Sequence, residues 1–98
     1  MSLFCNKSED LITIIEDVNA KIMESDNLMS NPMLNRVRIN QLLGDSLRCQ
    51  SKIIPIVEHA PSCMMTNVPI GNGEQSVPLY MWMQWAQNII QQIENTIR

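Results

Sequence analysis

Aromatic side chains are scarce in this chain of 98 residues, which contains one phenylalanine, one tyrosine and two tryptophans. Isoleucine, leucine and methionine must therefore fill most of any core. Histidine occurs once, and the three glycines form no phosphate-binding loop or nucleophile motif. With no such signature, we expect a protein that is not an enzyme and that holds no cofactor.

Long apolar runs and a positive charge balance are also missing. No stretch of about 18 apolar residues occurs, and no basic segment followed by an apolar one begins the chain. The formal net charge of -3 gives the whole molecule no long-range attraction for nucleic acid or an anionic membrane. We expect a cytoplasmic protein, of a cell or of a virus or phage inside its host, with no membrane partner.

The three cysteines, Cys5, Cys49 and Cys63, are few and widely spaced. This pattern differs from the dense, even-numbered cysteines of a secreted disulfide scaffold, and it predicts free thiols in a reducing compartment. A metal site built on His59 and these thiols is not expected, because zinc sites use ligands in closely spaced pairs.

Residues 8–24 have the apolar spacing of a helix. The acidic pair Glu9 and Asp10 would occupy its first turn, where the helix dipole favours negative charge. Leu3 and Phe4 precede it and are expected to pack onto it or onto a neighbouring subunit. The apolar positions that define its buried face are Leu11, Ile14, Ile15, Val18 and Ile22.

A second helix is predicted over residues 32–54, capped by Asn31 and opened by Pro32. The short connection to the first helix indicates an antiparallel hairpin. Gly44, which weakens a helix, suggests that another helix approaches closely there. The expected buried face comprises Ile39, Leu43, Leu47 and Ile54, flanked by Met33 and Leu42.

Residues 61–77 contain prolines, glycines and an Asn72-Gly73 turn signal. They predict a long loop that is mobile or functional, and a short strand over 63–68 could form within it. A third helix follows over 78–97, with Ser76 or Val77 as its cap. Together these elements predict one all-α domain over residues 1–98. It would be a three-helix bundle, or a helical hairpin plus a C-terminal helix that a second subunit completes.

Methionine and tryptophan gather around the predicted start of the third helix. Flexible thioethers beside indole rings form adaptable apolar surfaces that bind helices or peptides, although such residues also fill cores. The candidate contact residues for a partner protein are Met64, Met65, Met81, Trp82, Met83 and Trp85.

The second helix carries a basic strip of Arg38, Arg48 and Lys52, which would suit phosphate contacts. Asp45 lies three residues before Arg48 and is placed to neutralise it. No aromatic residue lies between the cations, as a single-strand binder would require. An ion-pair match with the acidic first helix is the preferred interpretation.

These patterns favour a small helical protein that binds another protein or itself. In general character the chain resembles small acidic helical proteins that act as secretion co-chaperones, assembly adaptors or phage-borne inhibitors, without sharing a motif with them. Two alternatives stay open. One is a dimeric nucleic-acid regulator that uses the basic strip, and the other is a purely structural, self-assembling subunit.

Overall fold

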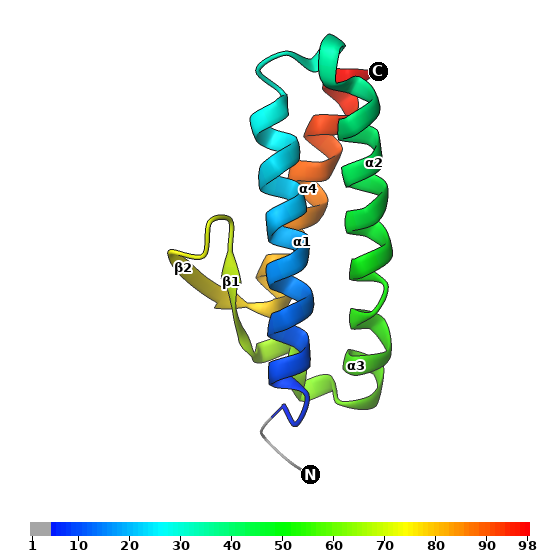
Figure 1. Ribbon diagram of the computed structural model, residues 1–98. Helices are drawn as coiled ribbons and strands as arrows, with labels where there is room; N and C mark the ends of the chain where they lie inside the picture. Colours follow the sequence, from blue (N-terminus) through cyan, green and yellow to red (C-terminus); the bar gives the residue numbers. More distant parts are fainter. Residues whose placement is uncertain (1–4) are drawn as a thin grey trace.

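The computed structural model describes residues 5–98 and is mostly helical, with one small sheet (Figure 1). Leu3 and Phe4 lie outside the described residues. The elements in chain order are α1 (Ser8–Leu28), α2 (Pro32–Gln50), α3 (Ile53–His59), the 3-10 helix η1 (Pro61–Met65), β1 (Asn67–Ile70), β2 (Gln75–Pro78) and α4 (Leu79–Ile97). The helical prediction is confirmed in this coarse form, and the two-stranded sheet adds to it.

Helices α1 and α2 form an antiparallel hairpin and pack closely along their lengths (Figure 1). The predicted cap is confirmed: the Asn31 side chain accepts a hydrogen bond from the Leu34 amide at 3.3 Å. Helix α1 continues to Leu28, one turn beyond the prediction. Ser25 is wholly buried within this last turn and donates to the Lys21 carbonyl, so packing overrides the polar character of the sequence there.

Helix α2 ends at Gln50, earlier than residue 54, and α3 begins at Ile53. Pro55 explains the break, because a proline inside a continuous helix lacks the amide that should bond to the preceding turn. In α3 the same proline occupies the first turn, where no partner is needed for its nitrogen.

The connection predicted over 61–77 is not an irregular loop. It folds into η1 and an antiparallel hairpin in which Val68 pairs with Val77. The predicted turn is present: Gly71 and Gly73 adopt positive φ angles of 62° and 87°, which glycine tolerates best. The predicted strand over 63–68 is displaced, since β1 begins at Asn67 and Cys63 lies in η1.

Helix α4 begins at Leu79, directly after β2, so neither Ser76 nor Val77 caps it. The Leu79 amide instead donates to the Thr66 carbonyl at 2.9 Å. The pairing of the two strands therefore decides where α4 starts. Periodicity predicted this boundary to within one residue, but it could not reveal the hydrogen bond to Thr66, which is a contact with a distant segment.

The prediction of three free cysteines is wrong. Cys5 and Cys63 form a disulfide that spans 58 residues of sequence and joins the segment before α1 to η1; only Cys49 is free among the described residues. Spacing in the sequence misses this bond because the fold brings the two residues together, with a Cα separation of 4.7 Å. Disulfides persist mainly in oxidising compartments, so the cysteines no longer favour a cytoplasmic location.

The core lies where α1, α4 and the hairpin meet. Trp82 of α4 is wholly buried there, and its indole Nε1 donates to Asn19 Oδ1 at 2.7 Å. Asn19 in turn donates to the Pro69 carbonyl of β1 at 2.8 Å. The apolar residues around this pair include Leu11, Ile15, Val18, Ile22, Ile39, Leu43, Val68, Leu79, Ala86, Ile90 and Ile93.

Candidate functional site

The six methionines and tryptophans proposed from the sequence do not form one open surface. Trp82 belongs to the core, and its ring centroid lies 6.5 Å from that of Trp85. Trp85, Met64 and Met83 are half-buried and pack against the same core. Only Met65 of η1 and Met81 of α4 are well exposed. Most of this cluster therefore stabilises the fold, and two of its members are accessible to a partner.

The basic strip is largely committed to ion pairs. The Arg38 guanidinium lies 3.2 Å from the Glu24 carboxylate of α1. This ion pair joins the second helix to the acidic first helix, as the charge pattern favoured. Arg48 pairs with Asp45 on its own helix. Lys52 is exposed and forms no ion pair within residues 5–98. The three cations thus present little unpaired positive charge.

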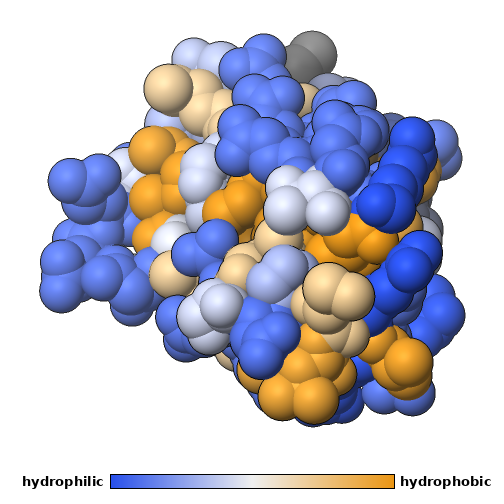
Figure 2. Space-filling view, turned by 90° about the horizontal axis from the view of Figure 1, so that it is seen from above, coloured by the Kyte–Doolittle hydropathy of each residue, from blue (hydrophilic) through white to orange (hydrophobic). Residues whose placement is uncertain are grey.

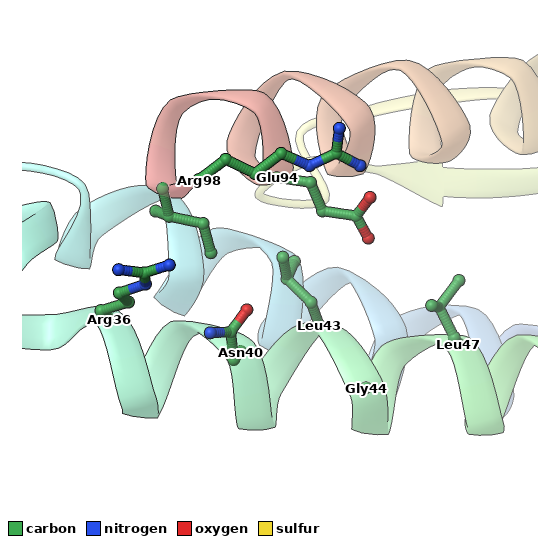
Figure 3. A pocket seen from close by; sticks show the side chains of 8 residues that line it. Arg36, Asn40, Leu43, Gly44, Leu47, Glu94 and Arg98 are labelled. Carbon is green, nitrogen blue, oxygen red and sulfur yellow. The ribbon is translucent and has the colours of Figure 1, made fainter.

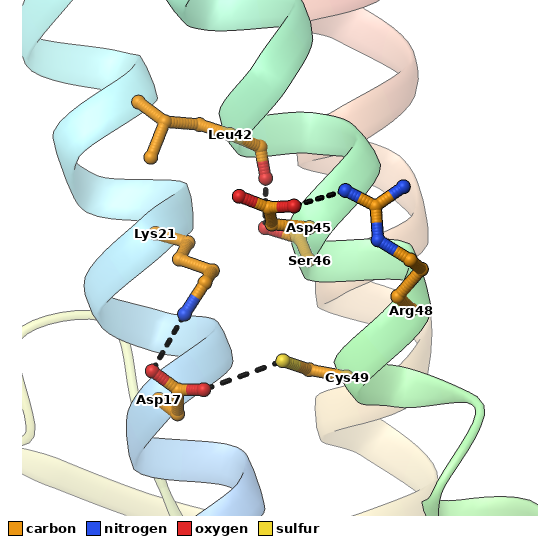
Figure 4. Close-up of polar contacts among 7 residues, drawn as sticks. All are labelled: Asp17, Lys21, Leu42, Asp45, Ser46, Arg48 and Cys49. Atoms are coloured by element: carbon orange, nitrogen blue, oxygen red, sulfur yellow. Dashed lines mark hydrogen bonds and ion pairs between the residues drawn. The ribbon is translucent and has the colours of Figure 1, made fainter.

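A small polar cluster joins α1 to α2 beside the Arg48 pair (Figure 4). Asp17 pairs with Lys21 at 2.6 Å and accepts a hydrogen bond from the Cys49 thiol at 3.3 Å. The Lys21 hydrogen bond lowers the pKa of Asp17, and the same contact raises the pKa of Lys21. Burial, followed by the hydrogen bond to Asp17, raises the pKa of the Cys49 thiol. A thiol held protonated in this way is a poor nucleophile at neutral pH.

The surface that the sequence did not single out is the outer face of α2, which we define as Met33, Val37, Asn40, Gly44 and Leu47. Met33 and Val37 are 90% and 72% exposed, and Leu34 at its edge is 79% exposed. Figure 2 views the molecule from above, by comparison with Figure 1, and shows several hydrophobic areas between polar side chains. The expectation that Met33 and Leu47 lie on or beside the buried face is wrong.

The reason is a shift of the buried face around α2. Residues Ile39, Leu42, Leu43 and Ser46 are the buried residues of α2 and face α1 and the core. The opposite side of the helix is therefore the outward one. Leu47 is 51% exposed, and so is Ile54 of α3, which lies beyond the break in the helix. The repeat of apolar residues at 33, 37 and 47 could have revealed a second face, because all three positions lie about 140–180° around the helix from buried Leu42.

Gly44 occupies the middle of the outer face. A methyl group at this position would meet only the Arg48 side chain, at 3.6 Å and beyond, which is ordinary van der Waals distance. Among residues 5–98, no atom of another helix lies within 4 Å of this methyl position, so the close approach that the glycine suggested is not made within the described part of the chain. Glycine costs about 1 kcal/mol relative to alanine inside a helix, and nothing in residues 5–98 requires it here.

A groove runs between the outer face of α2 and the last turns of α4 (Figure 3). It contains two neighbouring hollows of about 320 Å³ each, which share Arg36, Ile97 and Arg98. Arg36 and Arg98 carry positive charge and Glu94 negative charge, and none of the three forms an ion pair with another described residue. The further residues that line the hollows are Pro32, Met33, Asn40, Leu43, Gly44, Leu47 and Thr96.

A larger hollow of about 630 Å³ lies between α1 and the turn of the hairpin. Its lining includes Glu16, Asn27 and the backbone of Gly71 and Gly73. The Asn72 side chain accepts a hydrogen bond from the Glu74 amide at 3.1 Å, which stabilises the turn beside it. This hollow has one charged residue and no cluster of groups that would direct a reaction.

No three His, Cys, Asp or Glu side chains among residues 5–98 are grouped closely enough to hold a metal ion. None of the helices in this part of the chain is both long and apolar enough to span a bilayer. Comparisons with protein-family models, with curated proteins and with solved structures find no match to this chain. The function must therefore be argued from the surface itself.

Proposed function

We propose that the protein is a protein–protein interaction module and that a partner binds the outer face of α2 and the adjoining α2–α4 groove. The observation that carries this proposal is the exposure of Met33 and Val37 on successive turns of one helix, with Leu34 exposed beside them. Large apolar side chains gathered on one face typically mark an interaction site. Methionine is well suited to such a surface because its side chain adapts to different partners.

The shape of the molecule supports the same proposal. Its radius of gyration is 14.1 Å, whereas a compact chain of this length has about 12.6 Å. The principal extents of 50 × 25 × 18 Å describe a flat, elongated molecule. Such a molecule buries less of its apolar surface by itself, and a partner along its length would bury more.

Among the roles expected from the sequence, an assembly subunit or adaptor fits this surface best. Met65 and Met81 are proposed as a second, smaller contact area, since both are exposed and η1 packs against α4. The nucleic-acid alternative gains no support, because Arg38 and Arg48 already have carboxylate partners. Phosphate contacts would have to displace those partners first.

The test is affinity capture: the tagged chain is added to native lysate that also contains an untagged copy, and the proteins that bind to it are identified. We expect a bound protein that survives a high-salt wash, because burial of apolar surface is insensitive to salt whereas phosphate contacts weaken steeply. Val37→Glu should abolish the capture by placing a charge among the apolar residues of the outer face.

Gln84→Glu provides the matched control, because Gln84 is exposed on α4 and carries the same change of charge away from α2. Loss of binding with both variants, or with neither, would remove the outer face of α2 from the proposal. Nucleic acid that binds at low salt and leaves at high salt would favour the regulator instead.

A further inference from the structure

We infer that the partner at the outer face of α2 is a second copy of this chain, whose own α2 packs antiparallel against the first. This inference rests on the proposed function and names the occupant of the same surface. It starts from the spacing of the outer face: positions 33, 37, 40, 44 and 47 alternate steps of four and three residues. Steps of four and three residues average 3.5, which is the spacing of contact positions along paired helices in a coiled coil.

An antiparallel arrangement whose two-fold axis crosses the outer face at the level of Leu42 pairs four of its five positions with one another, and Met33 would lie opposite Ser51 of the second copy. Val37 of one chain would face Leu47 of the second copy, and the reverse contact follows by symmetry. Asn40 would face Gly44 of the second copy, so the two Asn40 amides approach one another across the axis. A single polar layer of this kind fixes the register of paired helices.

This arrangement explains why a glycine stands at position 44. Its missing side chain leaves space for the Asn40 amide of the second copy, whereas within one chain an added methyl group would meet only Arg48. The residue that costs helix stability in the single chain therefore permits close approach in the pair.

The charges are arranged for self-association as well. Met33, Val37, Asn40, Gly44 and Leu47 are all neutral, so two copies meet there without repulsion. Along the groove, Arg36 and Arg98 carry one sign and Glu94 the other, and none has an ion pair within residues 5–98. Two copies that lie in opposite directions can bring these opposite charges together, which a uniformly charged partner cannot do.

The experiment uses two full-length variants, Val37→Glu and Leu47→Lys, studied separately and as an equal mixture by sedimentation velocity over a range of concentrations. Positions 37 and 47 lie about 15 Å apart along one helix, so the new charges cannot pair within a chain. Each variant alone should weaken dimerisation by about tenfold or more, because a charge replaces an apolar contact twice in each dimer.

The mixture should recover most of the lost affinity. In the mixed dimer the new glutamate faces the new lysine, and the other side keeps the original Val37 and Leu47 contact. Both substituted residues are at least half exposed, so the single chain should keep its fold, which circular dichroism verifies. Gln84→Glu is the control and should dimerise like the unmodified chain.

The outcomes separate this inference from the proposed function. A chain that stays monomeric while capturing a different protein through Val37 would overturn the inference and leave the proposed function standing. A chain that neither dimerises nor captures a protein would overturn both. A dimer that ignores both variants, or that both variants weaken without recovery on mixing, would reject the antiparallel α2 pair.

Discussion

Asn19 joins three elements of the fold through one buried amide. It accepts from the Trp82 indole of α4 and donates to the Pro69 carbonyl of β1, while its own backbone belongs to α1. Replacement by leucine keeps the branching of the side chain, at a larger volume, but it leaves the buried indole N–H of Trp82 without a partner and removes the hydrogen bond to the part-buried Pro69 carbonyl. We expect Asn19→Leu to lower the free energy of unfolding by about 2–4 kcal/mol, since each unsatisfied buried group costs about 1–3 kcal/mol.

Urea denaturation followed by tryptophan fluorescence measures this loss, because Trp82 reports directly on the site. Asn88→Leu on the exposed side of α4 is the matched control and should change stability little. An Asn19→Leu protein as stable as the original would mean that Trp82 does not depend on this hydrogen bond.

The Cys49 thiol gives a prediction about pH. Burial and the hydrogen bond to Asp17 raise its pKa above the ordinary value, so the thiolate forms at higher pH than in a peptide. The folded state therefore holds the Cys49 proton more tightly than the unfolded state does. The contribution of this group to the free energy of unfolding is fully present below the unfolded thiol pKa of about 8.5, and it is lost as the pH rises through the higher pKa of the folded state.

Alkylation of Cys49 by iodoacetamide should therefore have a pH midpoint above that of a free peptide thiol. Asp17→Asn should lower the midpoint, because it removes the negative charge and leaves Lys21 unpaired beside the sulfur. A midpoint that does not move in this variant would show that burial alone holds the thiol protonated.

Two glycines in different backbone conformations should respond oppositely to alanine. At Gly44 the added methyl group has room and the helix gains propensity, so we expect Gly44→Ala to stabilise the single chain by about 0.5–1 kcal/mol. Gly71 has φ of 62°, where a side chain is strained, and Gly71→Ala should destabilise by about 1 kcal/mol. Thermal denaturation at dilution measures both. A loss of stability for Gly44→Ala would mean that the single chain needs this glycine.

At the scale of elements, the Cys5–Cys63 disulfide fastens the start of α1 to η1. Closing a loop of 58 residues stabilises a fold by about 4 kcal/mol in the chain-entropy model. The double variant Cys5→Ser/Cys63→Ala should lose stability of this order in urea denaturation, and hydrogen exchange should quicken first in η1 and the first turn of α1. Cys49→Ser is the control, because Cys49 lies outside the bond. Equal stability of the double variant and the control would contradict this role.

The elements differ in how far the sequence could predict them. Helix α4 was predictable almost to the residue, because its apolar stripe is long and uninterrupted, and the start of α2 followed from Asn31 and Pro32. The hairpin over residues 67–78 was hidden, since Pro69 and Pro78 argue against strands and only pairing between the two segments makes them extended. The disulfide likewise depends on a contact between distant segments, and so does the Leu79–Thr66 hydrogen bond that stands in place of the predicted cap of α4.

The candidate site was missed for a related reason. Helix α2 has apolar residues on two faces, and composition cannot tell which one the chain buries. Met33 and Leu47 lie on the outer face because Ile39, Leu42, Leu43 and Ser46 pack inward. The methionine and tryptophan cluster is divided by the fold: Trp82 fills the core of a chain that has few aromatic residues, whereas Met65 and Met81 are exposed.

At the scale of the whole molecule, a pair joined along α2 differs in shape from a pair joined end to end. The single chain is 50 Å long and 25 × 18 Å across, and α2 runs along the long axis (Figure 1). Side-by-side association should therefore double the scattering mass while the largest dimension grows only modestly. We expect small-angle X-ray scattering across a concentration series to show this pattern, with Val37→Glu staying at the single-chain values. A largest dimension that approaches twice that of the single chain as the mass doubles would place the contact at the ends of the molecule and exclude the outer face of α2.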